Sequence, residues 1–277
     1  MEVIMPCREF LRCAFGHIMN LGALCLPVRH DAATMSRKAS VTFLWWRVGK
    51  MTDLDAIPVF ETLDADTRAR ISQRCRRMSV DANQMIIDFE DPSTDVYFLV
   101  SGRVRILYRS PVGKEVILCE LGAGGCFGEL AAIDGRPRAA NVTALHRSEL
   151  VVMPAPFFSG LLHDNPAFAL HFLALLAERI RSLNTRLAEY SFLQVRPRLL
   201  CELLRLSRQR SGSSGERIIT PPPLQNDLAA RIGSRREVVS RELSALVRDG
   251  LVAKARGALV LTNPAELNRR ISVAMNA

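Results

Sequence analysis

The sequence predicts an α+β protein with three parts: a β-roll or jelly roll, one long helix, and a small basic unit of helices and a hairpin. Short strand-like runs with a period of two, separated by glycine turns, predict the β-roll. Leucine and isoleucine in an alternating three- and four-residue spacing predict the long helix. Charge sets the last part apart: residues 196–277 contain 15 Arg and Lys against 7 Asp and Glu, a net charge of +8 in a chain of +9.

This uneven charge predicts that only the last third of the chain meets a polyanion. A basic face that is merely solvated is the other interpretation of charge alone. The rest of the composition, 48% hydrophobic and 23% charged over 277 residues, is that of an ordinary globular protein. The sequence contains no P-loop and no nucleophile–base motif, so we do not expect an enzyme.

The seven cysteines form no CxxC pair, which indicates buried thiols in a reducing cytoplasm. Cys7, Cys13 and Cys25 could in principle hold an iron–sulfur cluster, but their spacing matches none of the common patterns. We therefore expect no metal, and this cluster remains the alternative.

Residues 1–50 form an unassigned extension. Their apolar stretch, residues 10–28, is interrupted by Arg12 and His17, so it predicts neither a membrane span nor stable membrane association. It also has no secretory cleavage site. A fresh domain start at Met51 suggests that the extension is an over-long start, and a membrane-surface or partner helix is the alternative.

A first domain is expected over residues 51–165. It opens with a helix over 65–78 that places Ile71, Cys75 and Met78 on one face. Strand-like runs follow over 85–90, 95–110, 114–122 and 139–154, with Gly102, Gly113, Gly122 and Gly124 as turns. Within the second run, Val104, Ile106 and Tyr108 alternate with arginines, and Leu107 is the one apolar residue on the arginine face. Many short strands of this kind favour a jelly roll.

The segment "GGCFGELAAIDGRPRAANVTA", residues 124–144, has the chemistry of a nucleotide site. One helical turn with small residues presents free amides to a phosphate and lets the backbone approach closely. Arg138 can pair with that phosphate. Glu129 would repel it, but an ionised carboxylate accepts hydrogen bonds, so a ribose hydroxyl is its natural partner.

The blocks "FGELA" and "PRAA", with nine residues from Glu129 to Arg138, resemble the phosphate-binding cassette of cyclic-nucleotide-binding domains. The resemblance implies that Glu129 binds the ribose 2′-hydroxyl and that Arg138 binds the cyclic phosphate of cAMP or cGMP. The backbone amides expected to join Arg138 are those of Gly128, Leu130, Ala139 and Ala140. The alternative is a cassette kept for structure, with an internal Glu129–Arg138 ion pair and no ligand.

A long helix is expected over about 166–193, in a segment that we bound at 166–195. Its apolar seam consists of Leu173, Leu176, Ile180, Leu183 and Leu187. Charged residues off the seam, among them Arg179, favour pairing of two such helices in a homodimer over a core-facing stripe. In the resembled domains this helix also covers the base, and cAMP-binding members place Thr and Ser where this chain has Leu183 and Asn184. Asn184 could bind a base edge, but this departure leaves cAMP open.

The last domain, residues 196–270, is predicted to be a winged helix-turn-helix. An amphipathic helix at its start is followed by helices over 224–231 and 235–248, a turn at Gly233, and a hairpin that turns at Arg256–Gly257. In the longer of those two helices Val239, Leu243 and Leu246 face a core. The opposite face carries Arg236, Glu237, Ser240 and Arg241.

The stretch "RREVVSR" resembles the recognition helix of the cyclic-AMP receptor protein/FNR family of bacterial regulators. Arg236, Glu237 and Arg241 fall on its base-reading positions, where Arg reads guanine and Glu reads cytosine. Arg235, Lys254 and Arg256 are better placed for phosphates. The order of cassette, long helix and winged domain predicts a homodimeric, cytoplasmic transcription regulator of double-stranded DNA, with RNA polymerase as a further partner. A regulator of the same fold that responds to a non-nucleotide ligand or to redox is the alternative.

Overall fold

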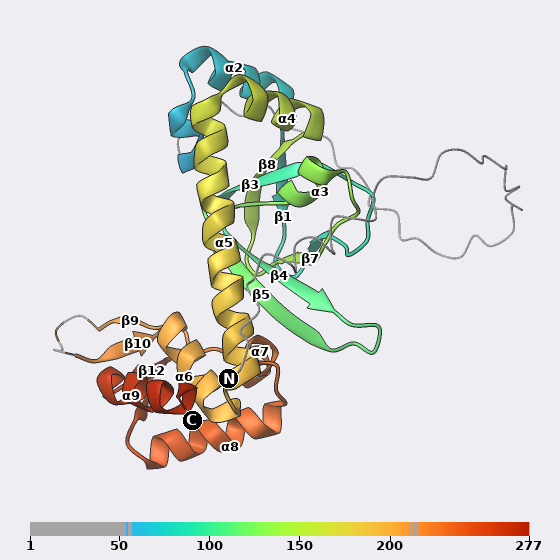
Figure 1. Ribbon diagram of the computed structural model, residues 1–277. Helices are drawn as coiled ribbons and strands as arrows, with labels where there is room; N and C mark the ends of the chain where they lie inside the picture. The colour runs from blue at the N-terminus through green and yellow to red at the C-terminus, as the bar shows by residue number, and fades with distance from the viewer. Residues whose placement is uncertain (1–53, 55–56, 211, 213–214, 277) are drawn as a thin grey trace, which may run out of the picture. The chain divides into compact units, whose positions relative to one another are not determined.

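The computed structural model describes residues 54, 57–210, 212 and 215–276 (Figure 1). The interpretations of residues 1–50, and the cluster considered for Cys7, Cys13 and Cys25, lie outside the described residues. Among the helices of the described part, none combines the length and the apolar run needed to cross a bilayer.

The described chain begins with a 3₁₀ turn, Pro58–Thr62, and helix α2, Ala65–Arg74. Asp64 caps α2, because its carboxylate accepts the amide of Thr67 at 2.6 Å. The prediction that this helix reaches Met78 is wrong. Cys75 is extended, and strand β1, Arg76–Val80, pairs antiparallel with β8, Ser148–Met153. The sheet ladder therefore overrides the helical spacing of Cys75 and Met78.

Two four-stranded antiparallel sheets, β1-β8-β3-β6 and β2-β7-β4-β5, form the predicted β-roll (Figure 1). The remaining strands are β2 Met85–Ile87, β3 Val96–Ser101, β4 Arg103–Arg109, β5 Glu115–Gly122, β6 Cys126–Phe127 and β7 Asn141–Ala144. Buried side chains from both sheets, such as Leu99, Val104 and Leu150, pack together as their shared core. Both sheets are thus joined through one interior, as a jelly roll requires.

Strand β4 departs from the predicted alternation. Its register against β5 shifts between Ile106 and Leu107. After this bulge Leu107 is buried at 4% exposure, whereas Tyr108 is 40% exposed and packs edge-on against Phe89. The prediction that Leu107 faces outward with the arginines is wrong, because one extra residue exchanges the two faces of a strand.

Helix α4, Ala155–Asp164, leads into the long helix α5, Pro166–Phe192, which ends within one residue of its predicted end. The first two turns of α5 are anchored by buried aromatic rings: Phe168 and Phe172 pack against Phe158. Beyond this anchor most of the predicted seam is open to solvent. Leu173, Ile180, Leu183 and Leu187 are 52–66% exposed, and only Leu176 packs partly against the core.

The C-terminal part has the predicted helix-turn-helix and wing. Its elements are α6 Val195–Leu206, β9 Arg208–Gln209, β10 Arg217–Ile219, α7 Gln225–Ile232, α8 Arg236–Arg248, β11 Val252–Ala255, β12 Ala258–Leu261 and α9 Pro264–Met275. Gly233 ends α7 at φ 59°, a left-handed conformation that glycine adopts readily. The strands form one sheet, β11-β12-β10-β9, and α9, which the sequence did not predict, packs on α6.

Candidate functional site

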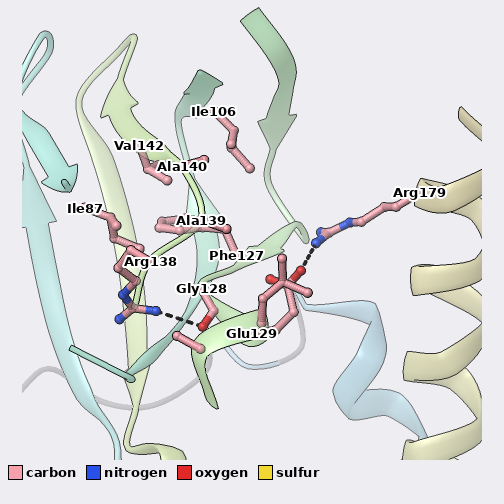
Figure 2. Close-up of a pocket in the computed structure, with 12 residues that line it drawn as sticks. Ile87, Ile106, Phe127, Gly128, Glu129, Arg138, Ala139, Ala140, Val142 and Arg179 are labelled. Carbon is pink, nitrogen blue, oxygen red and sulfur yellow. Dashed lines mark hydrogen bonds and ion pairs between the residues drawn. The ribbon is translucent and has the colours of Figure 1, made fainter. Parts of the chain in front are cut away.

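A pocket opens in the β-roll where β6 passes into the short helix α3, Glu129–Asp134 (Figure 2). It encloses about 420 Å³, part of which is open to solvent. Its lining comprises Ile87, Ile106, Phe127, Gly128, Glu129, Leu130, Ala131, Arg138, Ala139, Ala140, Val142 and Arg179. All six cassette residues predicted from the sequence are therefore brought together around one cavity.

Gly128 lies at the entrance to α3 with φ 82°, in the left-handed region. A β-carbon at this position would lie 2.7 Å from Nη1 of Arg138 and 2.9 Å from the carbonyl oxygen of Asp95. Both the backbone conformation and the lack of space therefore require glycine here. The close approach allows the carbonyl oxygen of Gly128 to accept a hydrogen bond from Arg138 at 2.8 Å.

Arg138 is only 3% exposed, and three protein oxygens hold its side chain in place. Besides its bond to Gly128, its Nη2 donates to the Asp95 carbonyl at 2.8 Å and its Nε donates to Ser93 at 3.1 Å. The guanidinium also lies 5.7 Å from the centre of the Tyr97 ring. Burial lowers the pKa of Arg138, yet an arginine stays charged at neutral pH. Three of its five N–H donors are therefore taken by protein oxygens, which leaves two.

Glu129 is also buried, at 5% exposure, and it pairs with Arg179 of α5. Nη1 of Arg179 donates to Oε1 of Glu129 at 2.6 Å, and its Nη2 donates to the Cys126 carbonyl at 2.5 Å. The alternative of an internal Glu129–Arg138 ion pair is therefore wrong, because each side chain has its own partners (Figure 2). The side chains of Glu129 and Arg138 are therefore both held by protein partners, and both residues line the pocket.

Arg179 is the residue of this site that sequence reasoning missed. The sequence placed it off the apolar seam, among the charged residues that favour pairing of two helices, and its spacing gives no sign of a buried partner 50 positions earlier. The predicted base contact, Asn184, is exposed on α5 and is not among the residues that line the pocket. Leu183 beside it is 52% exposed.

A second candidate surface lies on α8 and the hairpin. Arg236, Glu237 and Arg241 are exposed on one face of α8, with Ser240 half-buried among them, whereas the core-facing residues Val239, Leu243 and Leu246 are at most 5% exposed. Arg235, directly before α8, and Lys254 and Arg256 of the hairpin are exposed as well. The cationic residues that are predicted to bind DNA are thus exposed to solvent and are not packed in the core.

The thiols of the described chain are shielded rather than reactive. Cys75, Cys119, Cys126 and Cys201 are unpaired. Burial raises the pKa of Cys75 and of Cys126 to about 12 and that of Cys201 to about 11. Since the thiolate is the reactive form, these residues are poor redox sensors. No group of three potential metal ligands occurs among the residues that the structure describes.

Two protein families match the two surfaces. The cyclic nucleotide-binding domain family matches residues 77–165, and the Crp-like helix-turn-helix domain family matches residues 197–270. The first match contains the whole cassette and the second contains α8 and the hairpin. Each family therefore covers the region for which the geometry suggests the corresponding ligand.

Two bacterial relatives match long stretches of the chain. The cyclic AMP receptor protein of Thermus thermophilus is 34% identical over 175 residues, which are 62% of this chain and 77% of the relative. A CRP-like cAMP-activated global transcriptional regulator of Mycobacterium tuberculosis is 25% identical over 213 residues, which are 76% of this chain and 95% of the relative.

Solved structures share the fold. CooA from Carboxydothermus hydrogenoformans has a TM-score of 0.66 at 19% identity, over 80% of this chain and 98% of that chain. The c-di-GMP responsive global regulator CLP of Xanthomonas campestris has a TM-score of 0.63 at 24% identity, over 72% of this chain and 99% of that chain. The matches to a cyclic nucleotide-binding domain and to a Crp-like helix-turn-helix domain, together with the Thermus relative, show that the chain belongs to the Crp/Fnr family of transcription regulators.

Proposed function

We propose that a cyclic nucleotide, cAMP or cGMP, binds the β-roll pocket and controls DNA binding by a homodimer of this regulator. The observation that carries the proposal is the state of Arg138: three of its donors are fixed by the protein and two are left at a pocket lined by Glu129. A preorganised guanidinium of this kind pairs strongly with an anionic phosphate.

The pocket supplies a partner for each part of such a ligand. The phosphate would take the two remaining donors of Arg138 and the amides near Ala139 and Ala140, where small side chains allow close approach. A ribose hydroxyl would donate to Glu129, whose carboxylate is oriented by its ion pair with Arg179. The base would lie against the apolar walls, and Asn184 is our candidate for a polar contact to it.

The identity of the effector is the finer part of the proposal. The names of the Thermus and Mycobacterium relatives refer to cAMP, and that of the Xanthomonas structure refers to c-di-GMP. Regulators of this fold thus use more than one nucleotide. The departure at Leu183 and Asn184 is the reason to test cGMP beside cAMP in this chain.

Dimerisation is supported by the seam on α5. Leu173, Ile180, Leu183 and Leu187 remain largely exposed in one chain, although each is apolar. An a/d stripe of this kind is buried when a second α5 packs against it in a left-handed coiled coil. We propose that this contact forms the homodimer and that Leu176 lies at its edge.

For DNA, we propose that Arg236, Glu237, Ser240 and Arg241 read base edges in the major groove. Arg235, Lys254 and Arg256 would position the protein on phosphates. A two-fold dimer then reads half-sites about one helical turn apart. We further propose that the protein works in the cytoplasm and contacts RNA polymerase there.

Calorimetric titration of the full chain with cAMP and with cGMP tests the effector. We expect one of them to bind wild type, and Arg138→Gln to weaken binding by at least tenfold, since a charge-assisted pair contributes about 1.5–3 kcal/mol. Arg136→Gln is the matched control, because Arg136 lies two residues away and its side chain is 80% exposed. Equal binding by all three proteins would refute the role of Arg138, and no binding of either nucleotide to wild type would favour a non-nucleotide effector.

A further inference from the structure

A cluster of ion pairs joins β4 and β5 of the β-roll to α7, the first helix of the helix-turn-helix. Arg105 of β4 forms a bidentate ion pair with Asp227: its Nη1 donates to Oδ1 at 3.0 Å and its Nη2 donates to Oδ2 at 2.6 Å. The same arginine donates to Glu120 of β5 at 3.0 and 2.8 Å. Arg231, one turn after Asp227, reaches Glu120 at 2.5 Å. We call these four residues the strand–helix clasp.

The clasp is shielded from water. Side-chain exposure is 16% for Arg105, 15% for Glu120, 24% for Asp227 and 6% for Arg231. Pairs in such surroundings are screened little by salt, and removing one partner leaves an uncompensated charge. Arg231 is fixed further, because its Nη1 donates to buried Glu202 of α6 and its carbonyl accepts the Tyr190 hydroxyl at 2.7 Å. On the side of the helix-turn-helix, Arg231 is therefore held by α6 and α5 as well as by Glu120.

The strand that carries the clasp also forms a wall of the pocket. Ile106 lines the pocket, and Arg105, its neighbour in β4, forms an ion pair with Asp227 of α7. Successive side chains of a strand point to opposite faces, so β4 presents one face to the pocket and the other face to α7. Glu120 lies opposite Arg105 in β5, which places both clasp residues of the β-roll at the same level of the ribbon.

We propose that the strand–helix clasp is a coupling surface through which the β4–β5 ribbon holds α7, and hence α8, within the same chain. A displacement of Ile106 by a ligand would then reach the DNA-binding helices through β4 and α7. This role in regulation rests on the proposed function, whereas the docking of α7 by the clasp does not.

Hydrogen–deuterium exchange of the full chain tests the docking. We expect Arg105→Gln to increase exchange of the amides in residues 225–232 at least fivefold. Arg109→Gln is the matched control, because Arg109 lies in the same strand and pairs with exposed Glu115. The double variant Arg105→Gln/Asp227→Asn should exchange no faster than Arg105→Gln alone, as expected for two partners of one interaction. Equal exchange in wild type and Arg105→Gln would overturn the clasp.

Anisotropy titration of a labelled DNA duplex, with and without the nucleotide that binds, tests the coupling. Arg105→Gln should keep nucleotide affinity within about threefold while the ratio of the two DNA affinities falls toward one. An unchanged ratio would show that the clasp only stabilises the fold and would overturn the coupling. If wild type binds neither nucleotide, the proposed effector fails and the coupling role falls with it, whereas the exchange comparison still decides the docking.

Discussion

At the scale of single residues, the cassette depends on a glycine as much as on its charged groups. Gly128 has no room for a side chain beside Arg138 and adopts a backbone conformation with positive φ. We expect Gly128→Ala to push Arg138 away from its three oxygen partners. Its cost includes about 1–2 kcal/mol of backbone strain, plus the overlap, and nucleotide binding should be lost. Urea denaturation and calorimetry measure the two effects.

Gly135 provides the control for this substitution. It also has a positive φ, 69°, at the other end of α3, but a β-carbon there would meet nothing within 4 Å. Gly135→Ala should therefore show the backbone strain without the loss of binding. If both variants bind nucleotide like wild type, close approach at Gly128 is not needed for the site.

Residue types in the cassette could be predicted from the sequence, but not their protein partners. The spacing of Glu129 and Arg138 identified the pocket because local backbone geometry brings residues of one short segment together. Arg179 lies 50 positions from Glu129, and no periodicity links them. Such a long-range ion pair depends on how α5 packs on the β-roll, which a local pattern does not encode.

At the scale of secondary structure elements, the strength of the periodic pattern decided which predictions succeeded. Helix α5 has a long, regular seam, and its bounds agree with the prediction to within one residue. The segment around Met78 also has helical spacing, but it pairs with β8 instead, because a tertiary ladder outweighs a weak local preference. The bulge in β4 was equally hidden, since nothing in "RVRILYR" marks the extra residue.

The exposed seam of α5 leads to a prediction about assembly. We expect Ile180→Glu to convert the dimer to monomer, because a charge would have to be buried at the centre of the helix pair. Light scattering of the purified chain measures the mass. Ser182→Glu adds the same charge two residues away, at an exposed position off the seam, and should leave the dimer intact. Dimeric Ile180→Glu would mean that another surface holds the subunits together.

At the scale of the whole molecule, the distribution of charge fits the two proposed ligands. In the proposed function, the effector site would use buried Arg138 for one phosphate, whereas the DNA-binding end would use exposed cations for many. Residues 196–277 carry nearly all of the net charge of +9. The two ends should therefore respond differently to salt, since exposed charges are screened and buried pairs are not.

DNA binding should thus become weaker as salt rises, with a slope that counts phosphate contacts. If Arg235, Lys254 and Arg256 contact phosphates in both subunits, as proposed, they would make about six contacts, for which the logarithm of the binding constant falls with the logarithm of salt at a slope of about −5. Lys254→Gln removes two contacts and should make the slope shallower by about 2, measured by anisotropy at several salt concentrations. Lys114→Gln, an exposed lysine of the β-roll, should leave it unchanged. If Lys254→Gln keeps the wild-type slope, Lys254 does not contact a phosphate, and the salt dependence must come from the other exposed cations of this end.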